Sequence, residues 1–309
     1  METIFISIAA YQDPQLLDTM KSALDNSVYP DRIYFGVALQ YYNKPDLSGF
    51  KNTKTISYDP DTRPGIVRVR HNISRLLYDS QSYYLQIDSH YTFAPGWDEE
   101  LIKWFKHISS ESGTDKIMLL PLEPYPDGIM TSKFKLQLED SESGTLVVHP
   151  HPVNGKQKQY EDYHEICFAR VGQIFFPGSY VDNVGFDPYS HTIQEISYFS
   201  YRTIMSGYRV FQLNKAILWQ EDSEYYKAVW SGKDAEDTYR DPNRFKSGAV
   251  EDAIHTWHEM SLAWIYNDFS KYAVPNPAIT PEKFWEMQGD LDGYKASKSY
   301  FDKLIYNNL

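Results

Sequence analysis

The sequence of 309 residues predicts an α/β domain whose first third contains a parallel βαβ unit. The first observation is a pair of short apolar segments, residues 3–8 and 32–39, which are rich in β-branched and aromatic side chains, as strands are. The second is the helix-length segment between them, which begins at Asp13-Pro14 and ends near Asn26. Strands connected by a helix are typical of parallel pairing. The apolar content of 42% is sufficient for a buried core.

The segments that follow alternate between helices and strands. A helix is predicted to begin at Pro64, because apolar residues recur at helical spacing after it. We expect the next elements to be a strand over residues 83–87, an amphipathic helix over 97–107 and a strand over 116–120. Residues 123–162 are polar and rich in Gly, Pro and Ser. We interpret them as an excursion, a long segment that leaves the sheet and crosses the face where the active site would lie. We expect it to carry a hairpin, with strands near 133–138 and 145–149.

The second half of the chain adds further strands and ends in helices. We expect strands over 166–170 and 172–176, a helix over 192–206, two short strands within 208–219, helices over 248–265 and 281–287, and a helical end. Gly207 is placed to end the helix before it, as a glycine just after the last helical residue often does.

The charge and the composition exclude several classes of protein. Acidic residues number 42 and basic residues 30, so the formal net charge is −12, which disfavours a general nucleic-acid coat protein. No run of uncharged apolar residues approaches the length of a membrane span, and the opening METIFISIAA lacks the features of a signal peptide. We therefore expect no contact with a membrane. The single cysteine, Cys167, cannot form an internal disulfide, which fits a cytoplasmic location.

The strongest local signal is the segment YYLQIDSHYTF, in which Asp88 and His90 follow a buried strand. A carboxylate oxygen and an imidazole nitrogen two residues apart can turn toward one divalent ion where the chain bends. The alternative is that Asp88 caps a turn and His90 is a hydrogen-bonded surface histidine. The position favours a metal half-site, because ligands of open α/β sheets bind beyond the carboxyl ends of the strands.

Four arginines lie at and around the helix that precedes this strand: Arg63, Arg68, Arg70 and Arg75. The helix begins at Pro64-Gly65, so free backbone N–H groups and guanidinium groups are available to an anionic diphosphate. A solvated basic helix face is the alternative interpretation.

The segment RPGIVRVRHNISRLLYDSQSYYLQIDSHYTFAPGWDEEL resembles the GT-A glycosyltransferases that attach an N-acetylhexosamine to polypeptide hydroxyls. One similar branch is the polypeptide N-acetylgalactosaminyltransferases, with Arg-Glu-Gly-Leu-Ile-Arg-Ala-Arg, then Asp-x-His, then Gly-Trp. The other is the cytoplasmic hydroxyproline N-acetylglucosaminyltransferases and their microbial and viral relatives, whose Leu-Gln-Ile-Asp-Ser-His is matched letter for letter. The opening IFISIAAYQDP and the strand FGVALQ also resemble this second branch.

The resemblance implies a GT-A-type, Rossmann-like mixed sheet flanked by helices, with a helical C-terminal extension. Residues 1–222 would form the catalytic domain and residues 223–309 the extension. Within the catalytic domain, residues 1–122 would be the nucleotide-binding half and 123–222 the acceptor side.

The resemblance also implies roles for individual residues. Asp88 and His90 would hold Mn²⁺ or Mg²⁺, and the UDP-sugar would contact Arg63, Arg70, Asp88 and Ser89. Together with Asp88, Glu195 would be catalytic, because the related enzymes carry a Glu beneath the donor sugar early in the later helix. Thr192-x-x-Glu195 is also a capping box, so a structural role for Glu195 is the alternative.

The chain departs from these families at the third metal ligand. They place a His after the strand that follows the later helix, whereas Trp219 and Gln220 stand there in this sequence. Three arrangements remain open: an oxygen from Gln220, Glu221 or Asp222, a histidine from the excursion (His149 or His151), or two protein ligands with diphosphate and water.

The expected function is a metal-dependent, retaining transfer of a hexosamine, with GlcNAc favoured, from a UDP-sugar to a hydroxyl acceptor on a polypeptide. Front-face attack is favoured over a double displacement through Glu195. The alternatives are transfer to a glycan or to a hydroxymethylated base of viral DNA, and a degenerate non-catalytic binder of sugar nucleotides. The net charge disfavours DNA, which would need a basic strip such as Lys133, Lys135, Lys156 and Lys158. A metal-dependent hydrolase would need a second acidic or histidine cluster.

Overall fold

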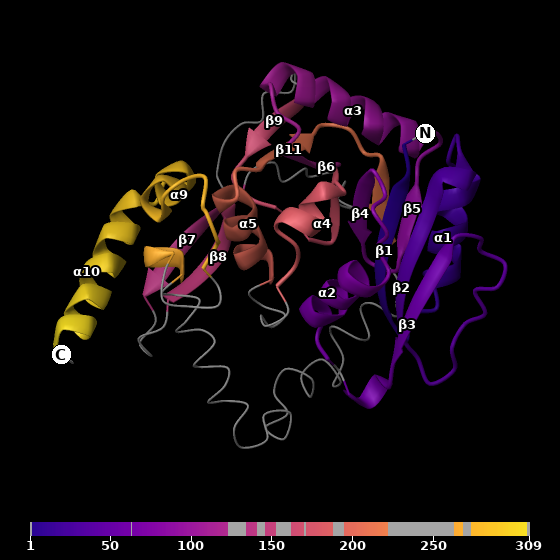
Figure 1. Cartoon of the computed structure of the whole chain (residues 1–309), viewed down its shortest axis with the longest axis horizontal. Coiled ribbons are helices and arrows are strands. Elements are labelled where there is room, and N and C mark those ends of the chain that lie inside the picture. Colours follow the sequence, from indigo (N-terminus) through magenta and orange to yellow (C-terminus); the bar gives the residue numbers. More distant parts are fainter. Residues whose placement is uncertain are drawn as a thin grey trace.

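The computed structural model describes residues 2–62, 64–122, 134–140, 146–152, 162–169, 171–187, 195–221, 263–267 and 273–307. Side chains are described throughout these ranges except at 134–140, 146–152, 195, 300 and 303–307. Figure 1 gives the arrangement of the elements, with β1 to β3 at one end of the molecule and the helices α9 and α10 at the other.

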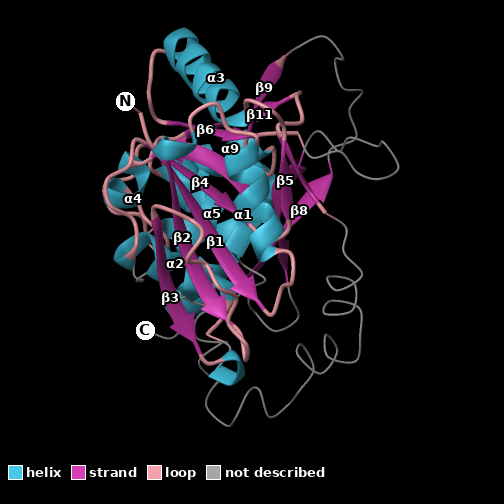
Figure 2. Ribbon diagram, turned by 90° about the vertical axis from the view of Figure 1, so that its right-hand side faces the viewer, coloured by secondary structure: helices cyan, strands magenta, loops and turns pink. Residues whose placement is uncertain are grey.

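The centre of the fold is an eight-stranded mixed sheet with the order β3-β2-β1-β4-β10-β6-β11-β9. Its strands are β1 (Ile4–Tyr11), β2 (Ile33–Gln40), β3 (Thr53–Tyr58), β4 (Tyr83–Ile87), β6 (Ile117–Leu120), β9 (Tyr163–Ile166), β10 (Gln173–Pro177) and β11 (Arg209–Leu213). The first four are mutually parallel, and β1 to β3 point the same way side by side in Figure 2. β10 runs antiparallel to both β4 and β6, and β9 runs antiparallel to β11. The predicted mixed α/β sheet is therefore confirmed.

The helices cover both faces of this sheet. They are α1 (Leu16–Asp25), α2 (Ile66–Leu76), α3 (Trp97–Ser112), α4 (Ser179–Asn183), α5 (Glu195–Met205), α9 (Pro281–Gln288) and α10 (Leu291–Asn307), with short 3₁₀ turns at Pro30–Arg32 and Pro60–Thr62. Because successive strand residues point to opposite faces, Phe5 and Ala9 join one hydrophobic cluster with α2, α5 and α9. Ile6 and Ile8 join the other, with α1 and α3. The central strands are thus buried on both faces.

Two small antiparallel pairs lie outside the main sheet. β7 (Phe134–Asp140) pairs with β8 (Leu146–Pro152), as the sequence predicts for the excursion. β5 (Tyr91–Phe93) pairs with β12 (Leu218–Gln220). The sequence does not predict β5, a three-residue strand that depends on a partner far along the chain.

Two expectations about local structure are wrong. The strand expected over 166–170 is β9, which ends at Ile166, because pairing with Val210 to Leu213 of β11 selects residues 163–166. The helix expected directly after Asp13 starts at Leu16 with Gln15 as its N-cap, and the Asp13 carboxylate makes other contacts, which are described below. Gly207 does follow α5 with φ +84°, as predicted.

The C-terminal helices share the core of the sheet domain. The ring of Phe284 in α9 packs edge-on against Tyr201 of α5 at a centroid distance of 4.9 Å, and the indole of Trp285 donates to the carbonyl of Trp264. Most of the helix expected over 248–265, and residue 222, the expected end of the catalytic domain, lie outside the described residues. In the part of the chain that the structure covers, no helix is long and apolar enough to cross a membrane.

Candidate active site

The candidate site lies where β4 ends, at the edge of the sheet formed by the carboxyl ends of parallel strands. Asp88 follows β4 directly, and Asp13 follows the neighbouring strand β1 by two residues. Because β1 and β4 are hydrogen-bonded in parallel, the segments that leave them emerge side by side. Ligands of open α/β sheets bind at such an edge.

The Asp88 carboxylate is held on one side by Arg70 of α2. The guanidinium Nη2 donates to Asp88 Oδ1 at 2.7 Å, and the Arg70 side chain is only 3% exposed, whereas that of Asp88 is 30% exposed. Gly172 lies beside the other oxygen, since a Cβ atom at this position would stand 3.1 Å from Asp88 Oδ2. The carboxylate is therefore fixed by a buried cation and has one oxygen facing a space that only glycine leaves open.

The His90 ring is held by Asp13. The Nδ1 atom of His90 lies 2.7 Å from Asp13 Oδ2, the same oxygen accepts a hydrogen bond from Ser89 Oγ at 2.6 Å, and the Gln15 backbone N–H donates to Oδ1 at 2.9 Å. Burial raises the pKa of the Asp13 carboxyl, but the hydrogen bonds from His90, Ser89 and Gln15 outweigh burial and keep the pKa below its ordinary value. Asp13 is therefore an ionised, buried carboxylate.

The other nitrogen of His90 faces Gln220. Strand pairing between β5 and β12 sets Gln220 opposite Tyr91, and the Glu221 N–H donates to the His90 carbonyl at 2.8 Å. The Gln220 amide then lies 2.6 Å from His90 Nε2. A half-turn of the amide exchanges its N–H₂ and its oxygen at this point. The residue that stands in place of the expected third histidine thus touches the imidazole of the Asp-x-His motif.

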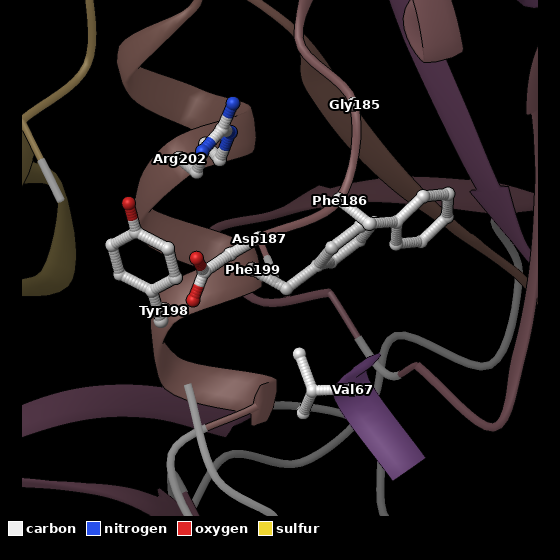
Figure 3. Close-up of a pocket in the computed structure, with 7 residues that line it drawn as sticks. All are labelled: Val67, Gly185, Phe186, Asp187, Tyr198, Phe199 and Arg202. Carbon is white, nitrogen blue, oxygen red and sulfur yellow. The ribbon is translucent and has the colours of Figure 1, made fainter. Parts of the chain in front are cut away.

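Helix α5 packs against α2 next to this edge. Figure 3 shows Phe199 of α5 beside Phe186, with Val67 of α2 below them, and Tyr198 and Arg202 of α5 also line the cavity. The cavity between them has a volume of about 10 Å³, which is room for one water molecule and not for a sugar. This contact places residues 198–202 of α5 near Val67 of α2, the helix that carries Arg70.

The comparison with protein families decides the class of the protein. The sequence model of a family described as Glycosyltransferase (GlcNAc) matches residues 3–68 and 50–247, which together make up most of the chain. The chain belongs to this GlcNAc glycosyltransferase family. It is accordingly a transferase of the GT-A type, in agreement with the observed mixed sheet.

A solved structure shows the same fold for this glycosyltransferase. The crystal structure of GalNAc-T7 with UDP, GalNAc and Mn²⁺ aligns with a TM-score of 0.56 and 13% identity, over 97% of this chain and 57% of that one. The glycosyltransferase thus spans little more than half the length of GalNAc-T7. The S. aureus TarS 1–349 structure aligns over 97% of this chain and 91% of that one, with 12% identity and a TM-score of 0.46. No curated protein sequence matches the chain.

The glycosyltransferase brings some of the predicted site residues together. Asp88 and Arg70 are in contact, and His90 and Ser89 share the Asp13 carboxylate. The Ser89 hydroxyl, 4% exposed, is directed at Asp13, and its role toward a UDP-sugar stays a prediction. Within the described ranges, no group of three or more His, Cys, Asp and Glu side chains could hold a metal ion.

Other predicted residues of the transferase lie where the structure does not describe them. Arg63, Thr192 and Asp222 are outside the described residues, as are the side chains of Glu195, His149 and His151. Glu195 is the first residue of α5. Among the remaining candidates for a third ligand, Glu221 accepts a hydrogen bond from Thr92 Oγ1 at 2.6 Å, whereas Gln220 reaches His90.

Asp13 is the site residue of the transferase that sequence reasoning missed. Asp13-Pro14 was interpreted as a helix start, because that dipeptide is typical of one. Its position two residues beyond the first parallel strand is a signal that could have identified it, since polar side chains there face the ligand edge of an α/β sheet.

Proposed function

We propose that this glycosyltransferase moves GlcNAc from UDP-GlcNAc to a hydroxyl group of a polypeptide, with retention of configuration and with a divalent metal ion. The observation that carries this proposal is the pair Asp88 and His90 at the end of β4, each held from behind by a buried partner. The letter-for-letter LQIDSH segment and the GlcNAc family description support the choice of sugar. The GalNAc-T7 structure, which contains UDP, GalNAc and Mn²⁺, supports the choice of nucleotide and metal.

The donor atoms at this edge fit Mn²⁺ or Mg²⁺. Asp88 offers a hard carboxylate oxygen, His90 an imidazole nitrogen, and Gln220 an amide oxygen after a half-turn of its side chain. Gly172 leaves space beside Asp88 Oδ2, which a larger residue would fill. We assign Asp88 and His90 as ligands, and among the arrangements open for the third we choose Gln220, because its amide reaches His90. When bound, the cation would neutralise the charge that develops on the departing diphosphate.

The chain's own cations and acids have distinct tasks in this proposal. Arg70 orients Asp88 and balances its charge. We assign Arg63, Arg70, Asp88 and Ser89 to contacts with the UDP-sugar. Glu195, at the start of α5, lies beneath the donor sugar. The acceptor hydroxyl attacks the anomeric carbon on the face that UDP leaves. The bond between that carbon and the β-phosphate oxygen breaks with its electrons on UDP, and the hydroxyl proton passes to that oxygen.

The boundary near residue 222 is part of the same proposal. Residues 1–222 form the catalytic domain, with 1–122 binding the nucleotide and 123–222 facing the acceptor, and residues 223–309 form the helical extension. The net charge of −12 favours a polypeptide acceptor over DNA. The single cysteine fits the reducing cytoplasm, where we place the enzyme.

A donor screen tests the function. The purified chain is incubated with Mn²⁺, a peptide library that contains serine, threonine and hydroxyproline, and UDP-GlcNAc, UDP-GalNAc or UDP-glucose in turn. We expect UDP release and a peptide mass increase of one N-acetylhexosamine with UDP-GlcNAc, both abolished by a chelator and by Asp88→Ala. Asp46→Asn, which alters a fully exposed carboxylate, is the matched control and keeps full activity. Absence of UDP release with every donor, or full activity in Asp88→Ala, overturns the proposal.

A further inference from the structure

We infer that Asp13 is a positioning residue: its carboxylate holds the His90 ring with the proton on Nδ1, so that the unprotonated Nε2 is presented to the metal ion. This inference rests on the proposed function, because it concerns how His90 becomes a ligand. It assigns a task to a residue that neither the Asp-x-His motif nor the family description contains.

The Asp13 carboxylate is locked in one orientation. Its Oδ1 atom accepts from the Gln15 backbone, its Oδ2 atom accepts from Ser89 Oγ and faces His90 Nδ1, and its own carbonyl accepts from Tyr41 OH at 2.6 Å. The residue is 6% exposed, so water does not compete for these contacts. A carboxylate fixed at both oxygens and at its backbone cannot turn to follow the imidazole. The imidazole must instead adapt to the carboxylate.

This geometry selects one tautomer of His90. Both carboxylate oxygens of Asp13 already accept hydrogen bonds, from the Gln15 N–H and from the Ser89 hydroxyl, so the 2.7 Å contact is made with a proton on Nδ1. In the neutral ring the lone pair is then on Nε2, where the Gln220 amide lies at 2.6 Å. The nitrogen that can bind a metal therefore faces the residue that stands in place of the third ligand.

A purely structural ion pair would not need this arrangement. Such a pair needs only some polar partner for Nε2, because a buried acceptor without one is costly, and it does not need that partner at the ligand edge of the sheet. Here the outer nitrogen meets a polar amide from β12, a strand that pairs with β5 through residues 91–93 and 218–220. A carboxylate behind a ligating histidine fixes the ring and raises its basicity, and loss of such a partner lowers metal affinity about 10-fold to 100-fold.

The first test compares two carboxylate-to-amide variants by calorimetric titration of Mn²⁺ in the presence of UDP. Asp13→Asn can offer Nδ1 either an acceptor or a donor, so the tautomer is no longer selected, and we expect Mn²⁺ affinity to fall about 10-fold to 100-fold. The matched control is Asp98→Asn, since Asp98 is also fully buried and accepts hydrogen bonds from the Val28 and Tyr29 backbone and from Arg32. It should lose stability and keep its Mn²⁺ affinity.

The second test uses the wild-type protein and does not depend on the folding of a variant. Long-range ¹⁵N–¹H correlation spectra of the metal-free protein report which nitrogen of His90 carries a proton. The His90 signals are assigned by their absence in His90→Ala. We expect a protonated Nδ1 and an unprotonated Nε2, and the opposite tautomer overturns the inference.

Failure of the proposed function and failure of the inference about Asp13 give different experimental results. If His90→Ala leaves Mn²⁺ affinity unchanged, the metal site of the proposed function is wrong, and the role of Asp13 is wrong with it. If His90→Ala lowers the affinity but Asp13→Asn does not, the proposed function stands and only the inference about Asp13 is overturned.

Discussion

Arg70 and Asp88 form a partly buried ion pair in which Nη2 donates to Oδ1 at 2.7 Å, with the buried guanidinium on α2 and the carboxylate at the end of β4. The pair connects the arginine-bearing helix to the Asp-x-His motif, two features that sequence analysis treats as separate signals. Burial of a guanidinium is costly without a charged partner. Asp88 therefore contributes to folding as well as to the site.

The first prediction separates these two contributions of Asp88. Asp88→Ala removes one acceptor of the buried Arg70 guanidinium and is expected to lower the free energy of unfolding by about 2 kcal/mol and to abolish turnover. Asp88→Asn still accepts a hydrogen bond, so it should retain more stability than Asp88→Ala, but its activity should fall at least about 100-fold because the negative charge is lost.

Denaturant titrations and UDP release measure the two effects of the Asp88 variants. The control is Asp79→Asn, which alters an exposed pair with Lys54 and should change neither quantity. An Asp88→Asn enzyme with wild-type activity would show that the charge at this position is not used.

The second prediction concerns Gln220 and its contact with His90. Gln220→Ala removes the amide, and we expect the Mn²⁺ concentration for half-maximal activity to rise about 10-fold. Gln220→His introduces the ligand that the related families carry there and should restore or tighten Mn²⁺ binding. Activity measured against Mn²⁺ concentration checks both variants, and identical curves for Gln220→Ala and wild type would remove Gln220 from the ligand set.

The third prediction uses the open space at Gly172. A methyl group there would stand 3.1 Å from Asp88 Oδ2, so Gly172→Ala should displace the carboxylate and lower activity about 10-fold or more with little change in the melting temperature. Gly49→Ala is the matched control, because a Cβ atom at Gly49 meets nothing within 4 Å. Equal activity in the two variants would contradict the assignment of Asp88 Oδ2 to the site.

The fourth prediction is a pH dependence of stability at Glu100, which accepts hydrogen bonds from Lys215 Nζ at 2.7 Å and Trp104 Nε1 at 2.8 Å. Burial raises the pKa of Glu100, but these partners outweigh burial and hold the pKa below its ordinary value of 4.5. A carboxyl with a lowered folded-state pKa stabilises the protein above its unfolded-state pKa and loses this contribution as the pH falls through the folded-state value.

The comparison of wild type with Glu100→Gln measures the contribution of Glu100. The difference in unfolding free energy should be about 1 kcal/mol or less near neutral pH. It should shrink as the pH falls below 4.5. A difference in unfolding free energy that grows on acidification would contradict the lowered pKa of Glu100.

The sequence was informative wherever the pattern is local. The strand at residues 83–87 and the helix from Trp97 were predicted with their observed starts, because burial on both faces and helical periodicity are visible in a few consecutive residues. The end of the strand before Asp88 was predicted for the same reason. β9 was displaced, because the register of a strand depends on its partner, here β11, which lies more than 40 residues away in the sequence.

The sequence predicted only some of the residues of the candidate site. Asp88 and His90 are two residues apart and could be recognised together, whereas Asp13 is 77 residues from His90 and Gln220 is 130 residues from it. Asp13-Pro14 is also typical of the start of a helix, so the sequence alone does not indicate that the Asp13 carboxylate contacts His90. The contact of Gln220 depends on β5, a strand too short to be predicted without its partner β12.

By itself, the sequence determined that the chain alternates helices and strands and that an acid and a histidine follow the strand that became β4, since hydrophobic spacing and turn chemistry act between near neighbours. Only the tertiary structure decided which groups hold those two side chains. The parallel pairing of β1 with β4 brings Asp13 to His90, the packing of α2 brings Arg70 to Asp88, and the pairing of β5 with β12 brings Gln220 to the imidazole. The physical reason is that these contacts close long loops, and hydrogen bonding between distant strands sets their register.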